Sequence, residues 1–302
     1  MVNVTFWGVR GSTPCPGEAN ARYGGNTACV SVEAPGLDPI VCDLGTGLRY
    51  FGQRLMDERS GDEPLRVLAL VTHLHWDHIQ GLPFFDPVHQ PDTTLVVRGR
   101  ADEGTLGDAF DRFMRPPFFP ITAVELIGDV SFHDLVDDEI TWGRARIVAR
   151  DVPHSGATNG YRIEVDGLAI AYISDHQQPA DVTEVSPGVL ELCRDADLVI
   201  HDAQYEAHEF AVKSDWGHCT IEYAVNVAAQ AGAKRLVLFH HDPSHDDQIV
   251  DRLLAEAREL AAGGPLVEVL AAHEGLTVAL TPPPTVNGSA TDGQVGVRVG
   301  EP

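Results

Sequence analysis

Cysteine is scarce in this sequence, and long apolar runs are missing. The five cysteines among 302 residues include no Cys-x-x-Cys pair, which argues against a disulfide framework and a separate structural zinc site. No apolar run approaches the roughly 18 residues that a membrane span requires. The amino terminus also lacks a basic region followed by an apolar stretch. These absences predict a cytoplasmic protein with no membrane partner.

Basic residues are also in short supply. The chain has 21 lysines and arginines against 45 acidic residues, which gives a formal net charge of −24. Such a field repels polyanions and weighs against extended nucleic acid as a partner. A local positive pocket could still hold one phosphate group, and the acidic surplus otherwise serves solubility.

The composition nevertheless supports one sizeable core, because 43% of the residues are hydrophobic. We expect a single domain over residues 1–280 and a flexible tail over residues 281–302, where a proline run and polar residues show no apolar periodicity. Sequence patterns predict strands at 2–9, 28–33, 40–43, 67–72, 95–97, 144–149 and 198–201, and helices at 48–58, 102–114, 220–231 and 246–262.

One short segment is dense in metal-binding side chains. His73, His75, Asp77 and His78 follow directly after the apolar run at 66–71. Imidazole and carboxylate are good ligands for zinc, iron or manganese, and four of them this close would carry a large desolvation cost without a cation. A solvated polar loop is the alternative, but a His-x-His-x-Asp-His cluster at a strand end is a specific signal.

The two halves of this cluster predict two metal positions. His73 and His75 are two residues apart and point the same way from an extended segment. Asp77 and His78 follow at the turn, which would carry them toward a neighbouring position a few ångströms away.

This loop resembles the histidine-rich loop of the metallo-β-lactamase superfamily, and the resemblance extends from about Val4 to Leu280. It implies an α/β fold in which two β-sheets are sandwiched between helices, the αββα arrangement, with the site built from loops at one edge. The pattern of elements alone supports only a mixture of α and β.

The resemblance also implies the remaining ligands, each at the end of an apolar strand: His154, Asp175 as the bridging residue, and His240. The cofactors would be two divalent ions, with zinc favoured and manganese or iron as alternatives. The implied set is His73, His75 and His154 on one metal, Asp77, His78 and His240 on the other, with Asp175 between them.

Two assignments have competitors. His241 could replace His240, although His240 directly follows the strand. His176 adjoins Asp175, but neighbouring side chains on an extended segment point in opposite directions. Five other histidines end no apolar strand, so we expect them to be solvated or structural: His89, His133, His208, His245 and His273.

Segments 197–203 and 216–220 resemble ribonuclease Z and related phosphodiesterases. There an acidic residue matching Asp202 orients a histidine matching His218, which can donate a proton to the leaving oxygen. Asp202 stands where glutamate is usual, and Cys219 where serine is usual. The shorter carboxylate leaves its contact with His218 open, and Cys219 is interpreted as a packing residue.

The implied mechanism is attack by a metal-bound hydroxide on a phosphoryl or carbonyl group. Asp77 would orient this nucleophile and take its proton. Asp43, in Val-Cys-Asp-Leu-Gly, is placed to hydrogen-bond a ligating histidine; the alternative is an aspartate that serves only the turn before Gly45.

Ribonuclease Z often carries a long glycine- and lysine-rich arm between the counterparts of His154 and Asp175. Here little more than a hairpin with Asp166-Gly167 joins them. We therefore expect a small phosphodiester, a cyclic nucleotide or cyclic sugar phosphate, as substrate. Arg10 and Asn26 lie in loops that resemble those of small-substrate relatives and could contact it.

Segment 112–120 combines aromatics, prolines and two arginines. It could form a rigid flap over the metals or a contact between the subunits of a homodimer. A thioester hydrolase of the glyoxalase type is the nearest rival function, and an iron-dependent redox enzyme or a regulatory metal-binding protein on the same fold remain further alternatives.

Overall fold

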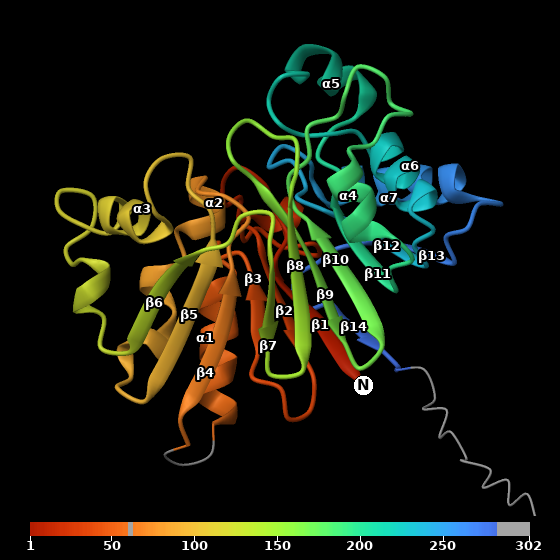
Figure 1. Cartoon of the computed structure of the whole chain (residues 1–302). Helices are drawn as coiled ribbons and strands as arrows, with labels where there is room; N and C mark the ends of the chain where they lie inside the picture. Colours follow the sequence, from red (N-terminus) through yellow and green to blue (C-terminus); the bar gives the residue numbers. More distant parts are fainter. Residues whose placement is uncertain (60–62, 283–302) are drawn as a thin grey trace, which may run out of the picture.

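Two seven-stranded β-sheets pack face to face, and helices cover their outer faces (Figure 1). This computed structural model describes residues 1–59 and 63–282. The first sheet has the order β14 (Thr277–Leu280), β1 (Val2–Gly8), β2 (Cys29–Glu33), β3 (Ile40–Cys42), β4 (Leu65–Leu70), β5 (Thr93–Gly99) and β6 (Asp129–Asp134). The second has the order β13 (Glu268–Ala271), β12 (Arg235–Phe239), β11 (Leu198–Asp202), β10 (Leu168–Ile173), β9 (Asn159–Val165), β8 (Ala145–Asp151) and β7 (Glu139–Trp142). This is the predicted αββα sandwich.

The helices occupy the outer faces and the connections between strands. They are α1 (Leu48–Glu58), α2 (Trp76–Ile79), α3 (Leu106–Phe113), α4 (Pro187–Cys193), α5 (Ala207–Lys213), α6 (Ile221–Gln230) and α7 (Asp247–Ala261). Short 3₁₀ helices lie at η1 (Glu18–Asn20), η2 (Leu82–Phe84), η3 (Asp86–His89) and η4 (Ala123–Glu125). No helix within residues 1–59 and 63–282 is long and apolar enough to cross a membrane.

Both sheets combine a parallel run with an antiparallel run. Strands β3 to β6 are parallel neighbours in the first sheet, and β10 to β13 are parallel neighbours in the second. The carboxyl ends of parallel strands meet at one edge of a sheet, which is where α/β folds build their sites. Asp43, Thr72, Ser174 and His240 all follow such ends directly or within two residues.

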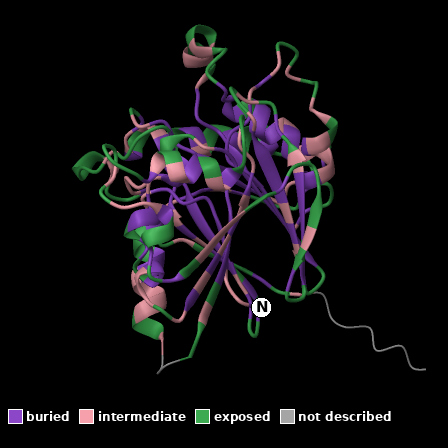
Figure 2. Ribbon diagram, turned by 60° about the vertical axis from the view of Figure 1, so that its left-hand side comes forward, coloured by how far each residue is buried: buried purple, intermediate pink, exposed green. Residues whose placement is uncertain are grey.

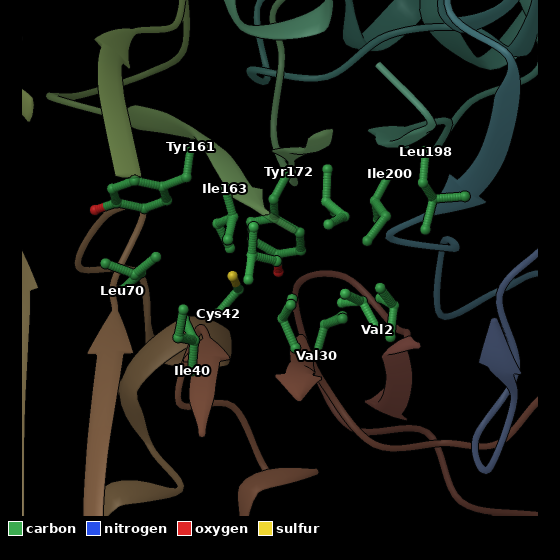
Figure 3. Close-up of a cluster of buried hydrophobic side chains, with 14 of the residues drawn as sticks. Val2, Val30, Ile40, Cys42, Leu70, Tyr161, Ile163, Tyr172, Leu198 and Ile200 are labelled. Atoms are coloured by element: carbon green, nitrogen blue, oxygen red, sulfur yellow. The ribbon is translucent and has the colours of Figure 1, made fainter. Parts of the chain in front are cut away.

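The main core lies between the sheets, where both contribute fully buried side chains. Tyr172 and Ile200 from the second sheet face Val30 and Ile40 from the first (Figure 3). Two further apolar clusters fill the space between each sheet and its helices. Figure 2 shows the buried residues concentrated in the strands and in the helix faces turned toward them. The all-apolar run of β10 fits a strand covered on both faces.

Most predicted elements are confirmed to within two residues, but the predicted helix at 102–114 begins too early. Thr105 caps α3 by accepting a hydrogen bond from the backbone N–H of Asp108, whose carboxylate bonds back to the backbone of Thr105. Gly104 adopts a φ of 73°, which ends any helical continuation toward residue 102. Of the predicted tail at 281–302, residues 283–302 lie outside the described residues.

Two glycines allow the histidine-rich loop to lie against the turn after β3. A Cβ on Gly81 would lie 2.0 Å from the carbonyl oxygen of Gly45, and a Cβ on Gly45 would lie 2.4 Å from the carbonyl oxygen of Asp77. The N–H of Gly81 donates to Leu44 O at 2.7 Å. These contacts fix the position of α2 relative to the segment that follows Asp43.

We expect Gly81→Ala to lower the free energy of unfolding by about 3 kcal/mol, because the added methyl overlaps a backbone carbonyl that cannot move freely. Gly17→Ala is the matched control, because nothing lies within 4 Å of its added Cβ. Its effect should stay within about 0.5 kcal/mol. Urea unfolding of both variants measures the difference, and equal stabilities would contradict the close packing.

Candidate metal centre

The candidate ligands reach one edge of the sandwich from both sheets. His73 and His75 lie on the segment between β4 and α2, and Asp77 and His78 lie within α2. The second sheet supplies the others from its own strand ends: His154 follows β8, Asp175 follows β10 and His240 follows β12. The structure therefore brings the whole predicted ligand set together, although it comes from four separate places in the sequence.

Three imidazoles form the first cluster. His73 Nε2 lies 2.8 Å from His75 Nδ1, which lies 3.3 Å from His154 Nε2. One atom from each of the three side chains falls within 4.8 Å of the others. Three ring nitrogens this close together are better satisfied by binding a common cation than by contacting one another.

Asp77, His78 and His240 form the second cluster. The Nε2 atoms of the two histidines are 3.2 Å apart, and Asp77 Oδ2 lies 3.2 Å from each of them. The backbone N–H of Ser12 donates to the same carboxylate oxygen at 2.7 Å. All three cluster side chains are buried.

Asp175 lies between the two clusters. Its carboxylate is 3.8 Å from His73 Nε2 and 3.9 Å from His154 Nε2 in the first cluster, and 3.2 Å from His78 Nε2 and 3.5 Å from His240 Nε2 in the second. Within the described residues, its Oδ1 atom is buried without a hydrogen-bond partner. A buried, unpartnered carboxylate oxygen needs compensation, and cations on both sides would provide it.

In three of the histidines, the outer ring nitrogen Nδ1 has a hydrogen-bond partner away from the clusters. This bond explains why the inner nitrogen Nε2 is available to bind a cation. Three histidines have a carboxylate or carbonyl oxygen, which can only accept, at hydrogen-bond distance from Nδ1, so that Nδ1 carries the proton and Nε2 keeps its lone pair. The bonds run from His78 to Asp43 Oδ2 at 2.8 Å, from His154 to Gly217 O at 2.7 Å and from His240 to Gln204 Oε1 at 2.7 Å. The donor set fits metal ions.

Burial shapes the protonation of the first cluster. It lowers the pKa of His73, His75 and His154, so these imidazoles remain neutral, which is the form that binds metal. In the second cluster, burial also opposes protonation of His78, but Asp175, Asp77 and Asp43 outweigh it and raise its pKa well above the usual range. The same negative field would attract a cation in place of the proton.

Asp43 connects the two sheets through its carboxylate. It accepts hydrogen bonds from His78 Nδ1 and from the backbone N–H and hydroxyl of Thr72 beside β4, and from the Tyr172 hydroxyl on β10 at 2.9 Å. Asp43 is fully buried. Its contact with a candidate ligand, predicted from sequence, is present.

Backbone strain gathers at the same place. Asp43, Ser12 and His240 adopt φ values of 58°, 60° and 60°, a left-handed conformation that is uncommon for residues other than glycine. Such residues cost roughly 1 to 3 kcal/mol each and persist where the surrounding structure over-determines them. Here the strained residues position ligands or bond to them.

Asp202 and His218 meet beside the clusters. Asp202 Oδ2 lies 3.0 Å from His218 Nδ1, so the shorter aspartate does reach the histidine. Backbone N–H groups of His176 and Gln204 also donate to this carboxylate. The ring of His218 stacks on that of His240, with 5.0 Å between centroids, and lines the same cleft. Cys219 is fully buried, as expected of a packing residue.

The competing histidines lie elsewhere. His241 Nε2 is 3.0 Å from Ala272 O, whereas His240 faces the cluster. His176 Nδ1 is 3.0 Å from His201 Nε2 in the interior behind Asp202. The structure thus places the predicted residues, and not their neighbours, in the two clusters.

Arg10 and Asn26 do not match the prediction that they contact substrate. Arg10 is fully buried and donates to the carbonyl oxygens of Gly24 and His245, at 2.7 and 2.6 Å. Asn26 donates to the Glu274 carboxylate at 3.0 Å. Both side chains point toward carbonyl or carboxylate groups of the chain itself and stabilise loops. For this reason neither of them lines the cleft.

Sequence reasoning missed Gln204 and Ser12. Gln204 orients His240 through its side chain, and Ser12 bonds Asp77 through its backbone. Gln204 stands two residues after Asp202, a neighbourhood that could have singled it out. A backbone contact such as that of Ser12 leaves no signal in residue type.

The clusters open onto a cleft of about 470 Å³. His75, Asp77, Asp175, His218 and His240 line its polar floor. A second hollow, of about 560 Å³, is lined by aromatic and aliphatic side chains and shares Leu74 and Trp76 with the cleft. Together they give a substrate both a reactive end and an apolar end.

Residues 39–241 match the family model for the β-lactamase superfamily domain. Among curated relatives, ribonuclease Z of Haloarcula marismortui is 26% identical in an alignment of 322 positions, which spans 91% of this chain and 96% of that protein. Ribonuclease Z of Geobacillus kaustophilus is 40% identical in an alignment of 237 positions, which spans 63% of this chain and 75% of that protein.

Solved structures share the fold. The short form of human tRNase Z superposes with a TM-score of 0.65 and 21% identity, covering 92% of this chain and 99% of that one. A diphosphatase from the PhnP family gives a TM-score of 0.65 and 19% identity, covering 93% and 99%. The family match includes every candidate ligand from His73 to His240, and this chain belongs to the β-lactamase superfamily, in the branch that contains ribonuclease Z.

Proposed function

We propose that this protein is a dinuclear metal-dependent phosphodiesterase that hydrolyses a small phosphodiester, of the cyclic nucleotide or cyclic sugar phosphate class. The observation that carries the proposal is the pair of ligand clusters bridged by Asp175 with the Asp202–His218 pair beside them. Binding sites for two cations support hydrolysis, and a positioned imidazole supports expulsion of an alkoxide.

His73, His75 and His154 would hold one cation, and Asp77, His78 and His240 the other, with Asp175 shared between them. Divalent ions held there supply Lewis acidity toward a phosphoryl oxygen and make water ionisable near neutral pH. Zinc suits a set made mostly of imidazole, with manganese or iron as alternatives.

Two residues of the chain carry out the two proton transfers, one at the attacking water and one at the leaving oxygen. Asp77 Oδ2 is held by the N–H of Ser12 and by two histidines, so its carboxylate can orient water and accept a proton. His218 keeps Nδ1 bonded to Asp202, which leaves Nε2 to donate a proton to the leaving oxygen. Asp202, itself fixed by backbone N–H groups, steadies the imidazolium form before that transfer.

A small substrate is supported by the lack of a gripping arm among the described residues. His154 and Asp175 are joined by a loop and the β9–β10 hairpin. The chain's only lysines are Lys213 and Lys234, and the net charge of −24 opposes a polyanion. A cleft of about 470 Å³ has room for a small diester.

The relatives favour a second candidate, cleavage of tRNA precursors, because both named proteins are ribonuclease Z. The first test should therefore compare bis(p-nitrophenyl) phosphate, cyclic mononucleotides and a tRNA precursor, using protein whose metal content is counted by elemental analysis. Cleavage of the small diesters with about two metals per chain supports the proposal. Cleavage of the precursor alone moves the second candidate ahead, and silence on every phosphodiester at full occupancy overturns both.

We expect His218→Ala to keep both metals and to lower kcat on bis(p-nitrophenyl) phosphate by about 10²- to 10⁴-fold, because the leaving oxygen loses its proton donor. His73→Ala should instead lower metal content and activity together. Elemental analysis and initial rates separate the two effects, with His208→Ala on the exposed face of α5 as the control. Wild-type turnover in His218→Ala would remove this residue from the mechanism.

We expect Asp43→Asn to weaken metal binding by about 10- to 100-fold, because the amide cannot accept from His78 and Thr72 as the carboxylate does. Tyr172→Phe removes only one outer bond to Asp43 and should have a smaller effect. Competition with a chromophoric chelator measures the affinities. Equal affinity in Asp43→Asn and wild type would show that this carboxylate serves the turn alone.

A further inference from the structure

The apolar hollow beside the metal centre has features that hydrolysis does not require. Trp76 is 75% exposed and Phe118 is 81% exposed, although large aromatic side chains are usually buried. Both line the hollow of about 560 Å³ together with Ile79 and Phe113. A pocket that holds exposed aromatic surface in a concave wall is the form of a ligand site.

The hollow adjoins the cleft. Leu74 and Trp76 line both spaces, and Trp76 stands in the sequence between the candidate ligands His75 and Asp77. A group attached to a phosphate at the clusters would therefore meet the indole ring first. This adjacency places the hollow where part of a substrate held at the clusters would lie.

Two polar side chains line the same wall: Gln80 is half-buried, and Arg112 is exposed, with Asp108 near enough to interact with it electrostatically. In the part of the chain that the structure describes, neither the Gln80 amide nor the Arg112 guanidinium takes part in a side-chain hydrogen bond or ion pair. An amide offers both donor and acceptor, and a guanidinium offers donors in a plane. Such groups can read the edge of a planar heterocycle whose face stacks on an aromatic ring.

We propose that this hollow is a nucleobase subsite, in which Trp76 and Phe118 stack on the base and Gln80 and Arg112 bond to its edge. The inference rests on the proposed function and narrows its substrate to a cyclic nucleotide. A cyclic sugar phosphate would fill the metal cleft and leave both aromatic surfaces in water. Segment 112–120, through Arg112, Phe113 and Phe118, then acts as the wall of the subsite.

The test compares substrates with and without a base. Wild type, Trp76→Ala and Phe118→Ala are assayed on the 3′,5′-cyclic monophosphates of adenosine and cytidine and on methyl riboside 3,5-cyclic phosphate, which lacks a base. Each variant should raise KM for at least one of the nucleotides by about 10- to 100-fold, because it loses one stacking surface. Cleavage of the base-free diester should stay within about twofold of wild type, and metal content should be unchanged.

Tyr50→Ala is the matched control, because Tyr50 is also an exposed aromatic residue, at 46%, and it lies on α1 and does not line the hollow. It should leave KM for every substrate unchanged. Loss of activity on the base-free diester equal to the loss on both nucleotides would overturn the subsite. So would conversion of a dimer to a monomer by Trp76→Ala and Phe118→Ala, which would make this face a contact between copies of the chain.

Adenosine binding gives a readout that needs neither phosphate nor turnover. Saturation-transfer NMR should show transfer to the adenine protons with wild type and a loss of most of that signal with Trp76→Ala. If wild type cleaves no phosphodiester, the proposed function fails, and adenosine binding alone then decides the subsite. Absence of adenosine binding to wild type, together with equal kcat/KM for nucleotides and the base-free diester, overturns the inference.

Discussion

The crowding of buried lone pairs at the edge of the sandwich is the constraint on which the rest depends. Inner nitrogens from His73, His78, His154 and His240 converge on the carboxylate of Asp175, and water is largely excluded from them. These side chains are stable together only if a hydrogen bond at the outer nitrogen holds each imidazole in place and a cation compensates the lone pairs and the carboxylate at the centre. The outer partners, the strained turns and the strand ends all serve that requirement.

Those outer partners differ in chemistry, and the difference matters. Asp43 is a buried carboxylate, Gln204 an amide and Gly217 a backbone carbonyl. A carboxylate increases the basicity of its imidazole most, whereas a carbonyl mainly fixes its orientation. The second cluster therefore carries more negative charge than the first, since Asp43 and Asp77 both lie at His78. The two positions are unequal although they share Asp175.

The sequence predicted the parts of the site that depend on residue type and strand ends. His73, His75, Asp77 and His78 are visible as a cluster, while His154, Asp175 and His240 were found only through the family resemblance. The fold was likewise predictable only in part. Apolar runs indicated the central strands, but they did not reveal how the strands pair to form the two sheets. Periodicity also placed the start of α3 too early, where Thr105 decides the boundary.

Other features had no sequence signal. Arg10 looks like a phosphate-binding residue in a glycine-rich loop, yet burial against carbonyl oxygens gives it a structural role. The hollow beside Trp76 depends on how α3 and the loop after it approach α2, and local sequence does not determine that distance. The contact of Asp202 with His218 depends on where the two backbone segments lie, which side-chain length alone does not determine.

The division of the ligands between the sheets links site assembly to folding. His73, His75, Asp77 and His78 belong to the first half of the chain, and His154, Asp175 and His240 to the second. Neither half can form a complete cage, so a cation that binds there favours only the state in which both halves are packed together. By mass action, a higher concentration of this cation then raises the free energy of unfolding of the whole molecule, and binding at the edge of the sandwich links the stability of one half to that of the other.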